Sequence, residues 1–401
     1  MFAFDATRLP KARTFRDPVH NLISWKSEGD VGRVIGKLID AREVQRLRFV
    51  RQLGLASLVF HGAEHTRFTH SLGVAHVARR MCHSLGIEGS DRLVVLAAAL
   101  LHDVGHAPFS HVMERVFGFH HEERSAAVVL DPDTEVHQTL ASVDATLPER
   151  VVSLLSGEDP SWMRDVVSSQ LDADRADYLL RDSVMTGIEV GRYDLERILL
   201  TLDHDDEGLV VNHGGYESVE GYLIARYHMY RLVYFHRAVR SAETMLESVF
   251  GRAAKLAREG DEEARASGPL ARLMRGEEVP AVEWAAWGEY DAWAHIARWA
   301  DHADPVLSGL ADGLLTRRLF KSNEREAAPG SPEWARDTEL ADHIRESLAP
   351  NERALFYVDE AGDVPYRPYV PSAGRRGVRV RDAQGRVFLS LIHISEPTRP
   401  Y

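Results

Sequence analysis

Histidine and aspartate side chains gather at the end of one apolar segment, and these residue types can hold a metal ion. The segment LAAALLHDVGHAPFSH spans residues 96–111 and places His102 and Asp103 directly after an apolar run. Two more histidines, His106 and His111, follow at once. Burying a charged group is costly unless it is paired or bound to a metal. The segment therefore predicts a metal site whose other ligands come from elsewhere in the chain.

Two residues outside this segment complete a candidate ligand set. His70 lies in the first turn of a helix expected over 66–85, and Asp174 lies in the polar segment DADRADYLLRD at 172–182. Imidazole and carboxylate ligands together suit iron, manganese, zinc or nickel better than calcium. Taken alone, His70 or Asp174 also fits a surface or helix-capping role. The adjacent His102 and Asp103 favour the metal site.

The elements that must position these residues are mainly helices. An amphipathic pattern covers 31–50, a buried helix is expected at 93–101, and one long helix at 216–250. On that long helix Arg226, Tyr230 and Tyr234 follow at i, i+4 and i+8 and share one face. This face is either an aromatic core stripe or the wall of a phosphate or base pocket. Beyond residue 251 we expect further helices, followed by strands at 353–358 and 377–388.

Bulk composition narrows the classes of function. The 401 residues carry a formal net charge of −13, which disfavours a general nucleic-acid binder. The only cysteine, Cys82, excludes an internal disulfide and fits a reducing compartment. The sequence contains no apolar run long enough for a membrane span and no secretory signal. We therefore expect a cytoplasmic protein without membrane or nucleic-acid partners.

Four motifs resemble those of the HD-domain phosphohydrolases. They are RFTHS at 67–71, LLHDVGHAPFSH at 100–111, HEERS at 121–125 and DADRADYLLRD at 172–182. Within that family the pattern is similar to the deoxynucleoside triphosphate triphosphohydrolases, both the bacterial dGTP-activated type and the human restriction factor with a sterile-alpha-motif domain. The resemblance covers about residues 15–247.

The resemblance implies a mostly α-helical fold in three parts. Residues 1–250 would form the helical HD core, and residues 251–388 a smaller α+β C-terminal region. Residues 389–401 include LSLIHISEPTR, which matches the translation of a common sequencing adapter. We interpret this last segment as an artefact and exclude it from the fold.

The resemblance also implies roles for the candidate metal and catalytic residues. The four metal ligands would be His70, His102, Asp103 and Asp174. His121 would act as the proton donor at the reacting phosphate, oriented by Glu114, with Asp103 as a further catalytic group. Histidine suits this task because its ordinary pKa lies near 6.5.

A larger set matches substrate-binding positions of the family. The residues that would hold the triphosphate are Arg67, His106, His111, Arg175 and Arg226. The residues that would contact the sugar are Gln52, Leu53, Tyr178, Asp182 and Tyr234. The family often has a lysine at the position of Arg175, and arginine keeps its charge. A tight apolar wall at Leu53 and Tyr234 would favour deoxyribose, because a 2'-hydroxyl would lack a partner there.

Asp40, Gln45 and Arg48 match positions that read the guanine of an activating nucleotide. An ordinary polar helix face explains the three residues equally well. The lysine that helps to hold the activator's phosphates in the family has no counterpart that we can place in this sequence.

The expected activity is metal-dependent hydrolysis of deoxynucleoside triphosphates to deoxynucleoside and inorganic triphosphate. Iron, manganese, zinc and nickel are all open as the resident metal, and Mg²⁺ would accompany the nucleotide phosphates. A dGTP or GTP activator and a homo-oligomer, either a dimer or a tetramer, are implied as partners. Two alternatives remain. One is an HD phosphohydrolase that acts on another nucleotide or phosphate ester, and the other is a nucleotide-sensing protein with a vestigial HD site.

Overall fold

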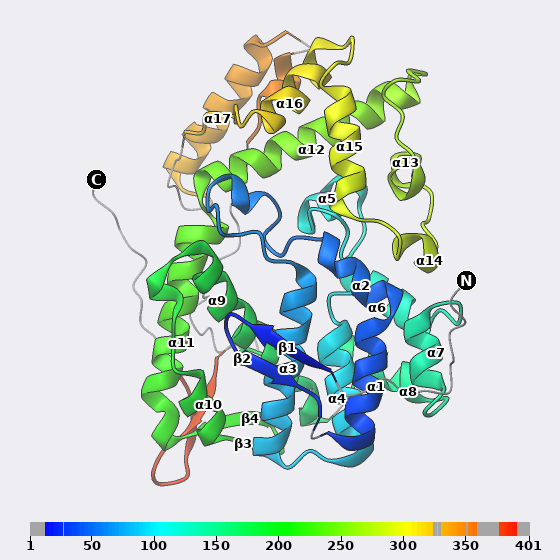
Figure 1. Ribbon diagram of the computed structural model, residues 1–401. Coiled ribbons are helices and arrows are strands. Elements are labelled where there is room, and N and C mark those ends of the chain that lie inside the picture. Colours follow the sequence, from blue (N-terminus) through cyan, green and yellow to red (C-terminus); the bar gives the residue numbers. More distant parts are fainter. Residues whose placement is uncertain are drawn as a thin grey trace.

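The computed structural model describes residues 13–26, 28–159, 161–323, 327, 330–349, 352–358 and 377–390. Most of these residues are helical, as the sequence predicted, and the strands are short (Figure 1). Among the described helices, none is both long and apolar enough to cross a lipid bilayer.

Helices of the first two hundred or so residues enclose the larger hydrophobic core. They are α1 (Gly29–Asp40), α2 (Arg42–Gln45), α3 (Arg67–Leu85), α4 (Gly89–Leu101), α6 (His121–Leu130), α7 (Glu135–Ala141), α8 (Leu147–Leu155), α9 (Ala173–Thr186), α10 (Leu195–Thr201) and α11 (Tyr216–Met229). Helix α3 packs against both α4 and α9. The residues of α4 from Leu93 to Leu101 are all buried, because this stretch is apolar on every face. These three helices therefore bring the candidate ligands together.

A second hydrophobic core lies around α12 (Arg237–Arg258), the long helix that crosses the upper part of Figure 1. The helices that accompany it are α5 (His111–Phe117), α13 (Gly268–Met274), α14 (Ala281–Trp284), α15 (Glu289–Trp299), α16 (Pro305–Leu315) and, further along, α17 (Pro332–Ser347). Phe109 and Met113, which flank His111, are buried in this second core. The domain boundary expected at residue 250 lies inside α12.

The prediction of one long helix over 216–250 is wrong. Helix α11 ends at Met229, a π-helical turn covers Tyr230–Tyr234, and α12 begins at Arg237. His236 is extended at the break, and its Nδ1 accepts a hydrogen bond from the backbone N–H of Ala238 at 3.3 Å. This side-chain cap replaces a helical hydrogen bond and starts a new helix. The amphipathic pattern at 31–50 also divides, because α1 ends at Asp40.

Within the described residues, the strands form two small sheets. Strands β1 (Thr14–Asp17) and β2 (Asn21–Ser24) form an antiparallel hairpin. The other sheet has the order β3-β4-β5-β6 and is built from β3 (Leu202–Asp205), β4 (Gly208–Asn212), β5 (Arg379–Arg381) and β6 (Val387–Leu389). The strands predicted at 377–388 are therefore confirmed, and β5 lies parallel to β4.

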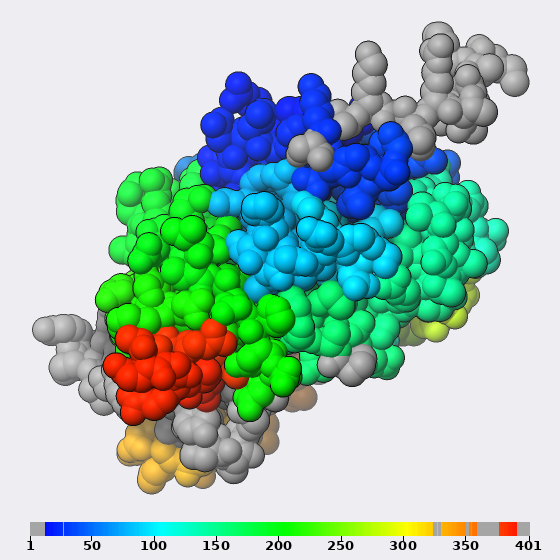
Figure 2. Space-filling view, turned by 90° about the horizontal axis from the view of Figure 1, so that it is seen from below, coloured from blue at the N-terminus to red at the C-terminus, as the bar shows by residue number. Residues whose placement is uncertain are grey.

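The C-terminal hairpin lies on the helical core instead of in a separate unit. Figure 2 shows residues 377–390 in red against the green surface formed by residues near position 200. Arg379 pairs with Asp205, and Arg381 pairs with Asp203. Leu389 closes β6, and residues 391–401 of the segment interpreted as an adapter lie outside the described residues.

The strand predicted at 353–358 is wrong. Residues 352–355 form a 3₁₀ turn that lies near α12 and α16. The hydroxyl of Tyr357 donates to Glu247 Oε2 on α12 at 2.9 Å. Leu355, Tyr357 and Val358 stay exposed, so the apolar residues of this segment do not mark a buried strand.

Candidate metal and phosphate site

The loop at 102–106 follows α4 and is held by hydrogen bonds from distant parts of the chain. The buried guanidinium of Arg46 donates to the carbonyl oxygens of residues 104 and 106, at 2.8 and 2.7 Å. It also donates to the carbonyl of Trp287 at 3.1 Å, while the indole of Trp284 donates to the carbonyl of residue 105. The backbone that carries His102 and Asp103 is therefore fixed from both hydrophobic cores.

The four predicted metal ligands come together at the ends of α3, α4 and α9. Asp174 Oδ1 lies 3.0 Å from His70 Nε2 and 3.6 Å from His102 Nε2. The two carboxylate oxygens of Asp103 lie 3.4 Å from His102 Nε2 and 3.8 Å from His70 Nε2. One ligand atom from each of His70, His102 and Asp174 lies within 4.8 Å of the other two.

The orientation of the two imidazoles fits a metal. His70 Nδ1 lies 2.9 Å from the carboxylate of Asp177, and His102 Nδ1 lies 3.0 Å from the carbonyl oxygen of Ala99. Both partners only accept hydrogen bonds, so each Nδ1 carries a proton and each Nε2 faces the two carboxylates. Burial alone would lower the pKa of His70, but Asp174 and Asp177 raise it to about 10, so a bound metal would replace the proton on Nε2. Both Nε2 atoms are buried and make no hydrogen bond to any residue that the structure describes. Two inward imidazole Nε2 atoms beside two carboxylates are a donor set for a divalent transition metal.

Arg67 reaches the metal site instead of standing free for a phosphate. It forms a buried ion pair with Asp103, and its Nε donates to Ser110 Oγ at 2.9 Å. Burial on its own would raise the pKa of Asp103, but Arg67 and His102 hold it well below the usual range. Asp103 therefore stays ionised, as a metal ligand must be.

His106, His111 and His121 surround the carboxylate of Glu114. His121 Nδ1 donates to Glu114 Oε1 at 3.1 Å, and the imidazole of His106 stacks on that of His121 with centroids 3.7 Å apart. These contacts hold the pKa of Glu114 far below its usual range, although burial opposes the shift. His111 faces outward, with 61% of its side chain exposed. The predicted donor His121 and its orienting carboxylate are thus in contact.

The backbone before His111 is strained. Phe109 and Ser110 have φ angles of 57° and 49°, which side chains other than glycine rarely adopt. Phe109 is fixed in this turn because its ring packs against Trp293 and Phe250 in the second core. The strain is compensated by this packing and places His111 at the start of α5.

The predicted sugar contacts form a connected network. The two carboxylate oxygens of Asp182 lie 2.7 Å from His65 Nε2 and from the hydroxyl of Tyr234, respectively. The backbone N–H of Gln52 donates to the carbonyl of His65, and Gln52 Oε1 is buried without a partner among the described residues. Tyr178 packs edge-on against Tyr234, with centroids 6.1 Å apart. Leu53 packs beside this network against the larger core and against a small apolar cluster of Ala56, Ala63 and Val239.

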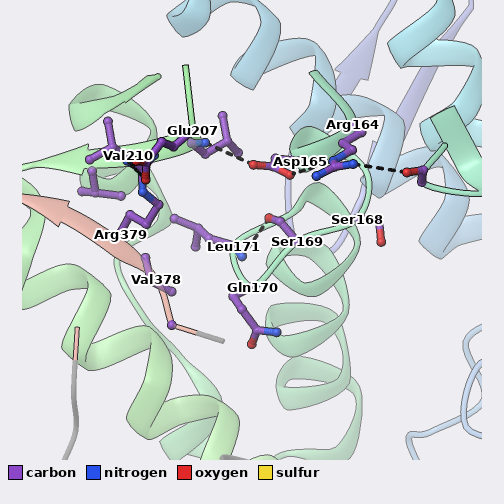
Figure 3. Close-up of a pocket in the computed structure, with 14 residues that line it drawn as sticks. Arg164, Asp165, Ser168, Ser169, Gln170, Leu171, Glu207, Val210, Val378 and Arg379 are labelled. Carbon is purple, nitrogen blue, oxygen red and sulfur yellow. Dashed lines mark hydrogen bonds and ion pairs between the residues drawn. The ribbon is translucent and has the colours of Figure 1, made fainter. Parts of the chain in front are cut away.

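Two predicted triphosphate contacts, Arg175 and Arg226, are anchored to one loop. Arg175 donates to the carbonyl of Ser169 at 2.6 Å and pairs with Asp172, which raises the pKa of its guanidinium. Arg226 Nη1 donates to Gln170 Oε1 at 2.9 Å. The same loop walls a cavity of about 310 Å³ that Figure 3 shows between residues 164–171 and the C-terminal strand with Val378 and Arg379.

The three residues matched to an activator site lie on one surface but already have partners. Asp40 pairs with Arg13, and Arg48 Nε donates to Gln45 Oε1 at 2.8 Å. Arg48 also covers the ring of Phe68, with its guanidinium carbon 3.6 Å from the centroid. Of the three, only Gln45 and Arg48 are joined by a hydrogen bond.

Sequence reasoning missed Asp177, His65 and Arg46, although each supports the site. Asp177 follows Asp174 by three residues on one helix, so helical spacing could have placed it beside His70. No local pattern distinguishes His65 or Arg46, because each has its partner far away in the sequence. Asp182 lies 117 positions from His65, and His106 lies 60 positions from Arg46.

Comparison with known proteins agrees with this geometry. Residues 67–182 match the HD domain family, and residues 193–267 match the HD associated region. The uncharacterised protein YwfO of Bacillus subtilis is 36% identical over 375 residues, which are 92% of this chain and 84% of YwfO. Human deoxynucleoside triphosphate triphosphohydrolase SAMHD1 is 27% identical over 285 residues, and its Dictyostelium discoideum homologue is 32% identical over 243. This chain spans only 44% and 46% of those two proteins.

A solved structure extends the likeness to the whole fold. The crystal structure of a phosphohydrolase from Bacteroides thetaiotaomicron superposes with a TM-score of 0.77 at 29% identity, covering 94% of this chain and 93% of that one. The matched HD domain contains all four predicted metal ligands, from His70 to Asp174. Fold, motif order and relatives agree, and the chain belongs to the HD-domain phosphohydrolases.

Proposed function

We propose that this protein hydrolyses deoxynucleoside triphosphates to deoxynucleoside and inorganic triphosphate. One observation carries the proposal: only the imidazole of His106 lies between the His121–Glu114 pair and Asp103 of the candidate metal site. His106 fills that space, with its Nε2 3.2 Å from Asp103 Oδ1 and its ring stacked on His121. A phosphate bound beside Asp103 would therefore lie within reach of a proton donor.

The polar groups near Tyr234 support a nucleoside as the remainder of the substrate. Asp182 and Gln52 offer acceptors for a 3'-hydroxyl, and Tyr178 offers an aromatic face for the sugar. Leu53 and the ring of Tyr234 would leave a 2'-hydroxyl without a partner. Such a site selects against the ribonucleotide because an unpaired buried hydroxyl is costly.

In the proposed reaction a water attacks the α-phosphorus, and the bond from phosphorus to the 5'-oxygen breaks. When bound by His70, His102, Asp103 and Asp174, a divalent metal would supply Lewis-acid activation of the phosphate and the water. His121 donates a proton to the departing 5'-oxygen, and Glu114 keeps its imidazole oriented. Arg175, Arg226 and His111 hold the triphosphate, which would carry its own Mg²⁺.

Arg67 has a defined part in this scheme. Its guanidinium neutralises Asp103 before the substrate arrives, so an incoming triphosphate would share an arginine that is already ordered. Preorganised charge of this kind supplies much of the rate in phosphoryl transfer. We also propose that a guanine nucleotide could activate the enzyme by exchanging with the present contacts of Asp40, Gln45 and Arg48, and that the chain forms a homo-oligomer.

The test is an incubation of metal-loaded protein with each of the four deoxynucleoside triphosphates and with GTP, with and without dGTP as activator. Nucleoside, triphosphate, pyrophosphate and phosphate are then resolved chromatographically. Deoxynucleoside with inorganic triphosphate is the expected product pair, and GTP should be the poorest substrate. Stimulation by dGTP would assign an activator site.

Matched variants make the result interpretable. Asp103→Ala should lose both bound metal and turnover. Glu196→Gln is the control: it changes an exposed residue of α10 that pairs with Arg80, and it should keep both bound metal and turnover. Release of monophosphate, pyrophosphate or free phosphate would instead identify a hydrolase for another phosphate ester. Full turnover by Asp103→Ala would refute the proposed mechanism, and a metal-loaded chain without any product would favour a nucleotide sensor.

A further inference from the structure

Four side chains beside the proposed metal site form a second donor cluster. Glu114 Oε1 lies 3.4 Å from His106 Nδ1, 3.2 Å from His111 Nδ1 and 3.1 Å from His121 Nδ1. One ligand atom from each of the four residues lies within 4.8 Å of the other three. The loop before α5, the helix α5 itself and the first residue of α6 provide them. None of the four belongs to the His70, His102, Asp103 and Asp174 set.

Hydrogen bonds alone leave this cluster unsatisfied. A single carboxylate oxygen has two lone pairs, so it cannot accept well from three imidazoles. Of the three contacts, His121 makes a hydrogen bond, whereas the buried Nδ1 of His106 makes none to any described residue. His106 is only 1% exposed. A buried polar atom without a partner needs an explanation such as a bound ion.

The protonation of His106 points the same way. Its Nε2 lies 3.2 Å from the ionised Asp103, which can only accept, so this nitrogen carries the proton. A neutral imidazole carries a single N–H, so only one of its two nitrogens can donate to a carboxylate. Nδ1 therefore directs a lone pair at the lone pairs of Glu114. Two acceptors that face each other inside a protein repel unless a cation lies between them.

The distances suit a transition metal. With bonds of about 2.0–2.1 Å, neighbouring ligand atoms of a tetrahedral zinc site lie roughly 3.3–3.4 Å apart. The three contacts of Glu114, at 3.1–3.4 Å, have this length. Three imidazoles and one carboxylate suit Zn²⁺, Co²⁺, Ni²⁺ or Cu²⁺, whereas Mg²⁺ prefers oxygen ligands.

We propose that His106, His111, Glu114 and His121 form a second transition-metal site, and that its occupation inhibits the enzyme. The metal would occupy Nδ1 of His121 and the oxygen of Glu114 that now orients it. An imidazole held in this way no longer delivers a proton to a leaving group at neutral pH, and the triphosphate loses His106 and His111. The inhibitory part rests on the proposed function, whereas the metal site itself does not.

The first measurement is metal stoichiometry on the full chain. Metal-free protein is dialysed against increasing free Co²⁺ or Zn²⁺, and bound metal is counted by elemental analysis, with visible absorption reporting four-coordinate Co²⁺. We expect two ions per chain in the wild type. Glu114→Gln and His111→Ala should each retain only the ion at the His70, His102, Asp103 and Asp174 site. His70→Ala should retain only the ion at the second site. Glu196→Gln, the surface control, should bind two.

His111→Ala is the most direct variant, because the exposed side chain leaves no buried cavity. Its affinity for the second ion should fall by more than the roughly 10–100-fold that loss of an outer-shell partner produces. One ion per wild-type chain, with binding unchanged in Glu114→Gln, would overturn the proposed site.

The second measurement is turnover against free Zn²⁺. Wild-type turnover should rise with the first equivalent and fall with the second, and the remaining turnover of His111→Ala should not fall. Equal inhibition of the wild type and of His111→Ala by Zn²⁺ would overturn the inhibitory role of the second site, although the site itself would still bind metal. Two bound ions without hydrolysis of any deoxynucleoside triphosphate would refute the proposed function and still support the site.

Discussion

Asp177 is a positioning residue whose removal should weaken metal binding without removing a ligand. Its buried carboxylate accepts from His70 Nδ1 at 2.9 Å, lies 2.6 Å from His20 Nε2, and accepts from the guanidinium of Arg181 at 2.8 and 2.9 Å. Burial favours the neutral form, but Arg181 and the two histidines hold the pKa of Asp177 well below its usual range. The perturbation that isolates this role is Asp177→Asn, which keeps the shape and removes the charge.

The expected effect has two parts. Loss of an outer-shell carboxylate typically weakens metal binding by about 10–100-fold, which is roughly 1.4–2.7 kcal/mol of binding free energy. Arg181 would retain one carboxylate, Asp17 at 2.9 Å, as its ion-pair partner. Breaking part of a buried ion pair costs about 3–5 kcal/mol of folding free energy, so the apoprotein should also unfold more easily.

The assay is a competition titration with a chelator of known affinity, performed well below the unfolding temperature, together with denaturant unfolding of the metal-free protein. His70→Ala is the positive control, since it removes the ligand itself. Glu196→Gln is the negative control, because exposed ion pairs contribute at most about 1 kcal/mol. Folded Asp177→Asn with wild-type metal affinity would show that His70 does not depend on this carboxylate.

Three further outcomes follow from the site and its surroundings. His121→Gln should lower turnover by roughly 10²–10⁴-fold while the metal held by His70 stays bound; unchanged turnover would exclude His121 as the proton donor. Protein with free metal at about 100 times its Kd should have an unfolding free energy about 2.7 kcal/mol higher than the same protein after the metal is removed by a chelator. Denaturant titration of the two samples measures this difference. Gly105→Ala should destabilise the fold by about 1–3 kcal/mol or more, because its Cβ would lie 2.3 Å from the backbone N of Ser125. The control Gly251→Ala, with nothing within 4 Å, should be neutral or stabilising by roughly 0.5–1 kcal/mol, and equal unfolding of both variants would contradict the steric argument.

The helical fold could be predicted because its signals are local. The apolar stretch of α4 ends directly at His102 and Asp103, and a helix delivers the residues at its end to a definite place. The order of histidine and aspartate motifs then indicates which helix ends meet. For the same reason the sequence predicts Asp174 beside His70, and in the structure Asp174 Oδ1 lies 3.0 Å from His70 Nε2.

What could not be predicted depends on contacts between distant segments. The break at His236 contains no proline or glycine, and helical periodicity continues through it, so tertiary packing of the aromatic segment decides the outcome. The surroundings of Arg67 show the same limit. Its sequence position indicates a basic group near a phosphate, but its ion pair with Asp103 depends on how α3 meets the end of α4.

The anchoring of the 102–106 loop has a consequence for biosynthesis. Trp284, whose indole donates a hydrogen bond to the carbonyl of Gly105, is synthesised 179 residues after that glycine. Trp287, whose carbonyl accepts a hydrogen bond from Arg46, is synthesised later still. Because domains fold progressively as they leave the ribosome, a nascent HD segment would wait for these residues before its loop is fixed. Chains released early would contain every metal ligand and still lack the contacts that hold them, which makes them targets for proteolysis rather than partial enzymes.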